Sequence, residues 1–196
     1  MRAQNDLLMK IYSGAKESWD GYNQVAAMRS AVASLTATNQ PAEVVAAAKV
    51  FDAKLEAVGG STSPGARGFG RGGPPPAPNF VRVNGTMGRA LSALDNADMA
   101  PTSATQRGYA ADCAQLKTVL TNWQAVNGRD LTALNAVLAK NNVAPIRAAA
   151  PSPALPACAA GLSAHDRRSV ATHSGTTVSH SRAQEEEDGE EGQDPR

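Results

Sequence analysis

Histidine is the side chain most often used for acid–base catalysis and metal binding, so its placement restricts both kinds of chemistry. The three histidines, His165, His173 and His180, all lie close to the C-terminal end, and residues 1 to 164 contain none. Spacers of seven and six residues separate them, whereas chelating ligands normally lie close together on an ordered element. We therefore expect no metal, haem or di-iron site and no cofactor.

The carboxylates of the helical part do not form an evident acid–base pair. Serine and threonine are numerous, but they have neither a histidine partner nor a Gly-x-Ser-x-Gly elbow. We predict no catalytic residue, and no enzyme activity for this chain alone. The acidic residues occupy positions that are mostly off the apolar helix faces, as on a solvated surface: Asp6, Glu17, Asp20, Glu43, Asp52 and Glu56.

A stretch rich in glycine and proline, from Gly59 to Asn79, contains the sequence ARGFGRGG. Its two arginines, Arg67 and Arg71, and the single aromatic residue Phe69 are too few to favour RNA binding. The stretch lacks the Gly-Lys-Ser/Thr step of a phosphate-binding loop, and a net charge of +1 gives no indication of nucleic acid as a partner. We interpret residues 60–79 as a flexible insertion.

Helices are the elements expected to position these side chains. Apolar residues every three or four positions predict helices from Asn5 to Leu35, from Pro41 to Gly59-Gly60, from Phe80 to before Pro101, and from a capping box at Ser103. Asn127-Gly128 then predicts a helix end, after which Asp130 would cap a short fifth helix. The expected fold is all-α, an antiparallel four-helix up-down bundle over residues 1–146 with a fifth capping helix.

The same spacing predicts the core. Aromatic residues make up only 4% of the chain. We assign Trp19, Tyr22 and Trp123 to the core. Where they face outward, we expect them to form a surface that binds a partner. The full expected core is Leu8, Trp19, Tyr22, Phe51, Leu55, Met87, Leu91, Leu94, Leu116, Leu120 and Trp123.

Periodicity ends at Arg147, and residues 147–196, with an acidic run from Glu185 to Glu191, are predicted to be a disordered tail. An altered reading frame or a spurious extension is the alternative interpretation of this tail. Cys113 and Cys158 lie in different kinds of segment, so we expect no disulfide, and Cys113 is assigned to the core. The sequence has no apolar run typical of a signal peptide or a membrane span. Met1 leads almost directly into helical periodicity, as a start inside a longer protein would.

Several stretches resemble the C-terminal helical region that follows the β-propeller in bacterial sortilin-like or Asp-box (BNR, sialidase-type) glycosyl hydrolase proteins. LLMKIYSGAKESWDGYNQVAAMRS is similar to the first helix of that region, with matches at Tyr12, Tyr22, Val25 and Arg29. FVRVNGTMGRALSALDNADMAPTSAT is similar to its third helix, through Asn84-Gly85 and the exit from Asp95 to Pro101. Trp123, Asp130-Leu131 and Leu134-Asn135-x-x-Leu138 resemble its closing motif, so the likeness covers residues 2 to 146.

The resemblance implies a non-catalytic structural and interaction module, the accessory domain of a propeller protein, with a neighbouring β-propeller as its partner. It also implies a secreted or periplasmic parent protein. Where aromatic residues face outward, the exposed apolar patch they form is also expected to cause weak self-association. The family's propeller and its carboxylates are missing here, so no active-site residue carries over. The alternative hypothesis is a free-standing helical module that binds a partner through the Arg/Gly-rich insertion or the acidic tail.

Overall fold

The computed structural model describes residues 2–61, 77–95, 100–150 and 158, and these residues are mostly helical with no strand among them. The predicted all-α class is confirmed. Most of the predicted insertion and tail, residues 62–76, 151–157 and 159–196, lies outside the described residues. The elements are α1 (Arg2–Thr36), α2 (Ala42–Gly59), α3 (Phe80–Asp95), α4 (Ser103–Ala125), a π-helical turn η2 (Val126–Asp130) and α5 (Leu131–Lys140).

Helix ends follow local rules with one small change. Gly60, with a φ of 83°, ends α2 as the Gly59-Gly60 step predicts, because glycine adopts this left-handed region at little cost. At the start of α4 the capping residue is Thr102, one position before the predicted Ser103. The Thr102 side chain accepts a hydrogen bond from the backbone N–H of Thr105, which satisfies one of the free donors of the first turn.

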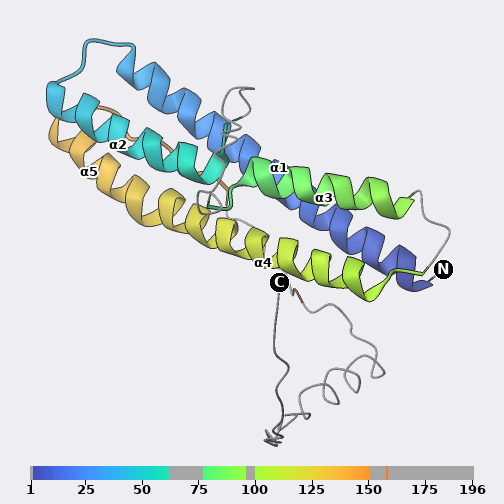
Figure 1. Ribbon diagram of the computed structural model, residues 1–196. Coiled ribbons are helices and arrows are strands. Elements are labelled where there is room, and N and C mark those ends of the chain that lie inside the picture. The colour runs from blue at the N-terminus through green and yellow to red at the C-terminus, as the bar shows by residue number, and fades with distance from the viewer. Residues whose placement is uncertain (1, 62–76, 96–99, 151–157, 159–196) are drawn as a thin grey trace, which may run out of the picture. The chain divides into compact units, whose positions relative to one another are not determined.

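The helices α2 and α3 both run antiparallel to α1 and follow one another along it (Figure 1). Contacts with α1 move toward its N-terminus as the chain proceeds: Asp52 pairs with Arg29, Phe80 meets Gly21, and Leu94 meets Gln4. Two successive helices therefore point in the same direction. This differs from the up-down order expected from the sequence, in which every helix would reverse the one before.

The predicted break at Asn127-Gly128 is wrong, because α4, η2 and α5 form one continuous helix. Backbone dihedrals stay in the right-handed helical region across both junctions, and the N–H of Leu131 reaches the carbonyl of Val126, an i to i−5 bond. Apolar contacts explain this π turn. Buried positions jump five residues, from Val126 to Leu131, and the extra residue keeps both on the inner face. Hence α5 extends α4 and is not a capping helix, and Asp130 makes no cap bond.

Small residues set the contact between α1 and α3. Gly14, Ser18 and Gly21, here called the small-residue stripe, are all buried on α1. A Cβ added at Gly21 would lie 2.4 Å from the ring of Phe80, and one added at Gly14 would lie 2.7 Å from the sulfur of Met87. Asn84 of α3 donates to the carbonyl of Ala15 at 2.9 Å across the same contact. Because α1 has no bulky side chain at these positions, the side chains of Phe80 and Met87 pack directly against its backbone.

This contact also rotates α1 away from the predicted orientation. Its buried face contains Leu7, Ile11 and Val25, whereas Trp19 is 51% exposed and Leu8 and Tyr22 are only partly buried. Trp19 is therefore not a core residue, and Leu91 of α3 is only partly buried as well. Sequence spacing marked the apolar flank of α1 instead of its small-residue face. The other expected core residues are buried: Phe51, Leu55, Met87, Leu94, Leu116, Leu120 and Trp123.

Alanine at Gly21 is expected to lower the free energy of unfolding by about 1 to 3 kcal/mol, because the added methyl group meets the rigid Phe80 ring. The matched control is Gly108→Ala on α4, where a Cβ would meet nothing within 4 Å. That variant should gain up to about 1 kcal/mol from helix propensity alone. Urea denaturation of both full-length variants measures the difference. Equal stability of the two variants would show that α1 and α3 do not meet closely.

Candidate functional site

Most of the carboxylates considered above as possible catalytic acids form ion pairs in the structure. Lys16 pairs with Asp20 at 2.6 Å within α1, and Lys140 of α5 pairs with Glu43 of α2 at 2.9 Å. These pairs are exposed, so each adds little to stability. Hydrogen bonding to Lys140 lowers the pKa of Glu43. At neutral pH this carboxylate is therefore ionised, and the ammonium group of Lys140 balances its charge. Among the described residues, no group of three His, Cys, Asp or Glu side chains is placed to hold a metal ion.

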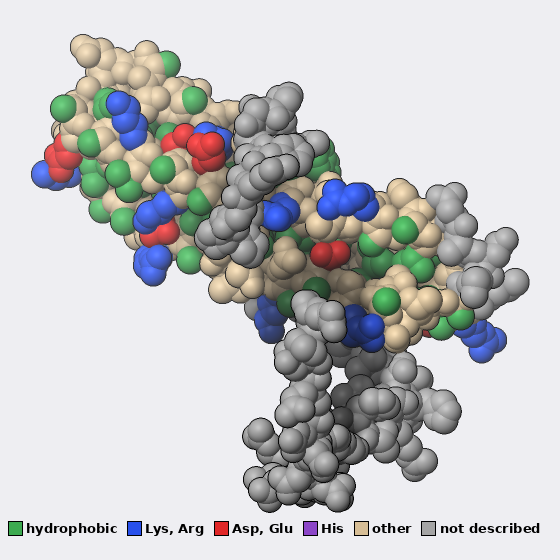
Figure 2. Space-filling view, viewed as in Figure 1, with side chains coloured by type: hydrophobic (Ala, Val, Ile, Leu, Met, Phe, Trp, Pro, Cys, Tyr) green, Lys and Arg blue, Asp and Glu red, His purple; other side chains and the backbone are tan. Residues whose placement is uncertain are grey.

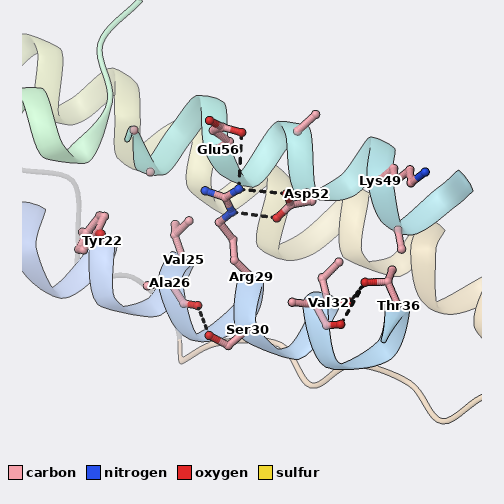
Figure 3. A pocket seen from close by; sticks show the side chains of 15 residues that line it. Tyr22, Val25, Ala26, Arg29, Ser30, Val32, Thr36, Lys49, Asp52 and Glu56 are labelled. Atoms are coloured by element: carbon pink, nitrogen blue, oxygen red, sulfur yellow. Dashed lines mark hydrogen bonds and ion pairs between the residues drawn. The ribbon is translucent and has the colours of Figure 1, made fainter. Parts of the chain in front are cut away.

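A groove of about 560 Å³ runs between α1 and α2 (Figure 3). Arg29 lies at its centre and donates from Nε to Oδ1 of Asp52 at 2.8 Å and from Nη2 to Oδ2 at 3.0 Å. The same Nη2 reaches Glu56 at 3.5 Å. Hydrogen bonding to Asp52 raises the pKa of Arg29, which keeps the guanidinium charged. Arg29 therefore joins α1 to α2 through Asp52 and Glu56.

A second groove, of about 320 Å³, lies between α2 and α5 and is mainly apolar. Val50, which is 62% exposed, and Val137 are among the residues that line it. Figure 2 shows hydrophobic side chains gathered over this end of α2 and α5, with charged side chains beside them. Lys54 of α2 pairs with Asp130 at 3.0 Å at its edge. This α2–α5 groove is one apolar surface on the described part of the chain.

The aromatic strip of α1, defined as Tyr12, Trp19 and Tyr22, is the clearest candidate for an interaction surface. Tyr12 and Trp19 are each more than half exposed, and Met9 one turn earlier is 58% exposed. Trp19 stacks on Tyr22, with ring centroids 5.4 Å apart and ring planes 25° apart. Stacking holds the indole in place, so a broad apolar ring faces solvent without being freely mobile.

Trp123 does not belong to this surface, and its assignment as an interaction residue is wrong. It is completely buried in the core, and its indole N–H donates to Oε1 of Gln24 at 3.0 Å. A buried indole requires such a partner, which Gln24 of α1 provides. Of the three predicted interaction residues, the structure therefore brings Trp19 and Tyr22 together near the surface and places Trp123 between α1 and α4.

Two carboxyl groups have raised pKa values because burial disfavours their charged forms. Glu17 of α1 has one oxygen, Oε2, that is buried without a hydrogen-bond partner in the described part of the chain. Asp112 of α4 is likewise desolvated, and a hydrogen bond from Thr86 only partly offsets this. Burial raises the pKa of Tyr109 as well, and the Glu17 charge adds to the effect. These groups lie at helix contacts and outside the three grooves and surfaces described above.

The disulfide between Cys113 and Cys158, with Cα atoms 5.4 Å apart, contradicts the expectation of unpaired cysteines. The segment of residues 143–150, here called the strap, contradicts the expectation that the chain is disordered from Arg147. Asn127 and Asn135 each exchange two hydrogen bonds with its backbone. Helical periodicity carried no signal for these contacts, because an extended segment has no such period.

Comparison with known proteins adds no relative: no family model, curated protein or solved structure matches this chain. No described helix is long and apolar enough to cross a membrane.

Replacement of Glu17 by Gln is expected to stabilise the chain at neutral pH. The pKa of Glu17 is higher in the folded chain than its ordinary value of 4.5. The protonated carboxyl therefore favours folding at pH values below 4.5. This contribution to stability is lost as the pH rises through the raised pKa of the folded chain. Glu17→Gln removes this loss, and its advantage at pH 7 should vanish near pH 4. Thermal unfolding across this range measures it. The control is Glu43→Gln, which removes an exposed ion pair with Lys140 and is not among the groups that shift the pKa of Glu17. A lower stability of Glu17→Gln at pH 7 would contradict the assignment.

Proposed function

We propose that this chain is a non-catalytic interaction module that docks on a partner protein through the aromatic strip of α1. The observation that carries the proposal is the position of Trp19, half exposed and stacked on Tyr22. Tryptophan and tyrosine contribute strongly to binding energy at protein interfaces, because each covers a large apolar area with few rotatable bonds. Polar residues such as Lys16 and Asp20 lie beside the strip and provide the start of a polar rim.

The partner we propose is the β-propeller domain of a glycosyl hydrolase-like protein, to which the chain would be the accessory domain. Support comes from the resemblance of the first helix, whose matching residues include Tyr12 and Tyr22 of the strip and Arg29 of the α1–α2 ion pair. Arg29 has a structural part in this proposal, because it fixes α2 against α1. Tyr22 of the strip lines the same α1–α2 groove as Arg29.

An oxidising compartment is part of the same proposal. Disulfides persist in secreted and periplasmic proteins and are rare where thiol reductants are abundant. The Cys113–Cys158 bond supports such a location for the chain. It also bears on the tail, because Cys158 falls within the segment that sequence analysis considered a product of an altered reading frame. A cysteine that pairs with a core cysteine is better explained as an authentic part of the protein.

The proposal predicts that Trp19→Ala weakens binding to a β-propeller domain of the proposed glycosyl hydrolase-like kind by about 30-fold, as expected for loss of a central aromatic contact. The full chain and the propeller domain, supplied separately, are titrated by calorimetry, with sedimentation reporting self-association. Val50→Ala is the control, because it truncates another apolar side chain that is more than half exposed, in the α2–α5 groove.

Loss of binding in Val50→Ala but not in Trp19→Ala would contradict the strip as the docking surface. Full binding by both variants would favour the alternative module, which uses the Arg/Gly-rich insertion or the acidic tail. A panel of chromogenic glycosides and peptides tests the non-catalytic part. Turnover that disappears on replacement of a single carboxylate would contradict it.

A further inference from the structure

The strap packs along the face formed by α4, η2 and α5. After α5 the chain turns at Asn142, the one described non-glycine residue with a positive φ, 56°. Val143, Ile146 and Ala149 are partly buried against the core, whereas the residues between them are exposed. One inward residue in every three is the period of an extended, left-handed polyproline-type chain, and Pro145 lies within this stretch.

Two asparagine side chains bind the strap through its backbone. Asn135 donates to the carbonyl of Ile146 and accepts from its N–H, both at 2.9 Å. Asn127 bonds to the carbonyl and N–H of Ala149 in the same way, at 3.1 and 2.8 Å. The two asparagines are eight residues apart on the helix, about 12 Å, and the two strap residues are three apart, about 9 Å in an extended chain. The spacings are close enough for the flexible side chains to bond to both strap residues together.

The disulfide ties the chain beyond the strap to the same helix. Cys113 is on α4 and is 1% exposed, whereas Cys158 is only partly buried. Apart from the disulfide, the strap is held through side chains. After the turn at Val143, none of its described backbone groups forms a hydrogen bond with the backbone of a helix. A few such hydrogen bonds have a small net effect, because the freed groups bond to water instead.

We propose that the Cys113–Cys158 disulfide is a redox latch, which holds the strap on the α4–η2–α5 face when oxidised and lets it dissociate when reduced. Dissociation exposes Asn127 and Asn135 together with the apolar surface under Ile146. Paired carboxamides of this kind recognise an extended backbone of any sequence. The latch therefore controls access to a surface suited to an extended peptide segment.

A dithiol is taken as the reductant, and the exposure of the two cysteine residues indicates which sulfur it attacks. A dithiol thiolate attacks Sγ of the more accessible Cys158, the S–S bond breaks, and Cys113 leaves as a thiolate that takes up a proton. The second thiol of the reagent then attacks the mixed disulfide and releases Cys158 as a thiol. Two electrons and two protons pass to the protein, and the reagent is oxidised to its cyclic disulfide.

Amide hydrogen exchange of the full-length chain tests the latch at Ile146 and Ala149, whose N–H groups donate hydrogen bonds to Asn135 and Asn127. Their protection should fall at least about tenfold when dithiothreitol reduces the chain, and it should return on reoxidation. Cys158→Ser should exchange at the fast rate with or without the reductant. Asn122→Ala, which changes an exposed asparagine of α4 away from the strap, should behave as the unmodified chain does.

Amides of buried α1 and α2 residues, such as Val25 and Phe51, provide the internal reference for folding. The strap should lose much more protection than these reference amides, which should stay strongly protected because the bundle remains folded. Equal strap protection in the oxidised chain, the reduced chain and Cys158→Ser would overturn the latch. A loss at Val25 and Phe51 as large as the loss in the strap would also overturn it, because the disulfide would then stabilise the whole bundle and not the strap in particular.

Discussion

The close contact between α1 and α3 is the constraint on which the other features of the bundle depend. It needs Gly14, Ser18 and Gly21 on one face of α1, because Met87 and Phe80 occupy the space that larger side chains would fill. Asn84 adds hydrogen bonds to the carbonyl of Ala15 and to Ser18, so the contact is polar as well as tight. A 35-residue helix with two interior glycines has weak intrinsic propensity, and this packing makes it stable.

The orientation of α1 in turn decides which aromatic side chains are available at the surface. With the small residues inward, the strip of Tyr12, Trp19 and Tyr22 lies on the flank of the helix, while Trp123 fills the interior from α4 and bonds to Gln24. The π turn similarly decides which side chains face outward on the continuous helix formed by α4, η2 and α5. It keeps Val126 and Leu131 on one face and leaves Asn127 and Asn135 positioned to bind the strap.

Sequence periodicity predicted the helices and most of the core, since an apolar residue every three or four positions is a direct consequence of helix geometry. It placed α1 incorrectly because hydrophobic patterns give weight to Trp19 and none to Gly14 or Gly21, although the glycines are the buried residues. Asn127-Gly128 has the composition of a helix end, and only the tertiary contacts on both sides keep it helical. The Cys113–Cys158 bond and the strap depend on long-range proximity, which no local pattern encodes.

The central claim, that the small-residue stripe faces inward and Trp19 outward, is tested most directly by fluorescence quenching of the two tryptophans. Trp123→Phe leaves only Trp19, and Trp19→Phe leaves only Trp123. Acrylamide should quench Trp19 readily, with emission typical of an indole in water, because half of its surface is exposed. Trp123 should be shielded and should emit at shorter wavelength. A shielded Trp19 beside an accessible Trp123, in chains that remain helical, would contradict the orientation of α1 and the account built on it.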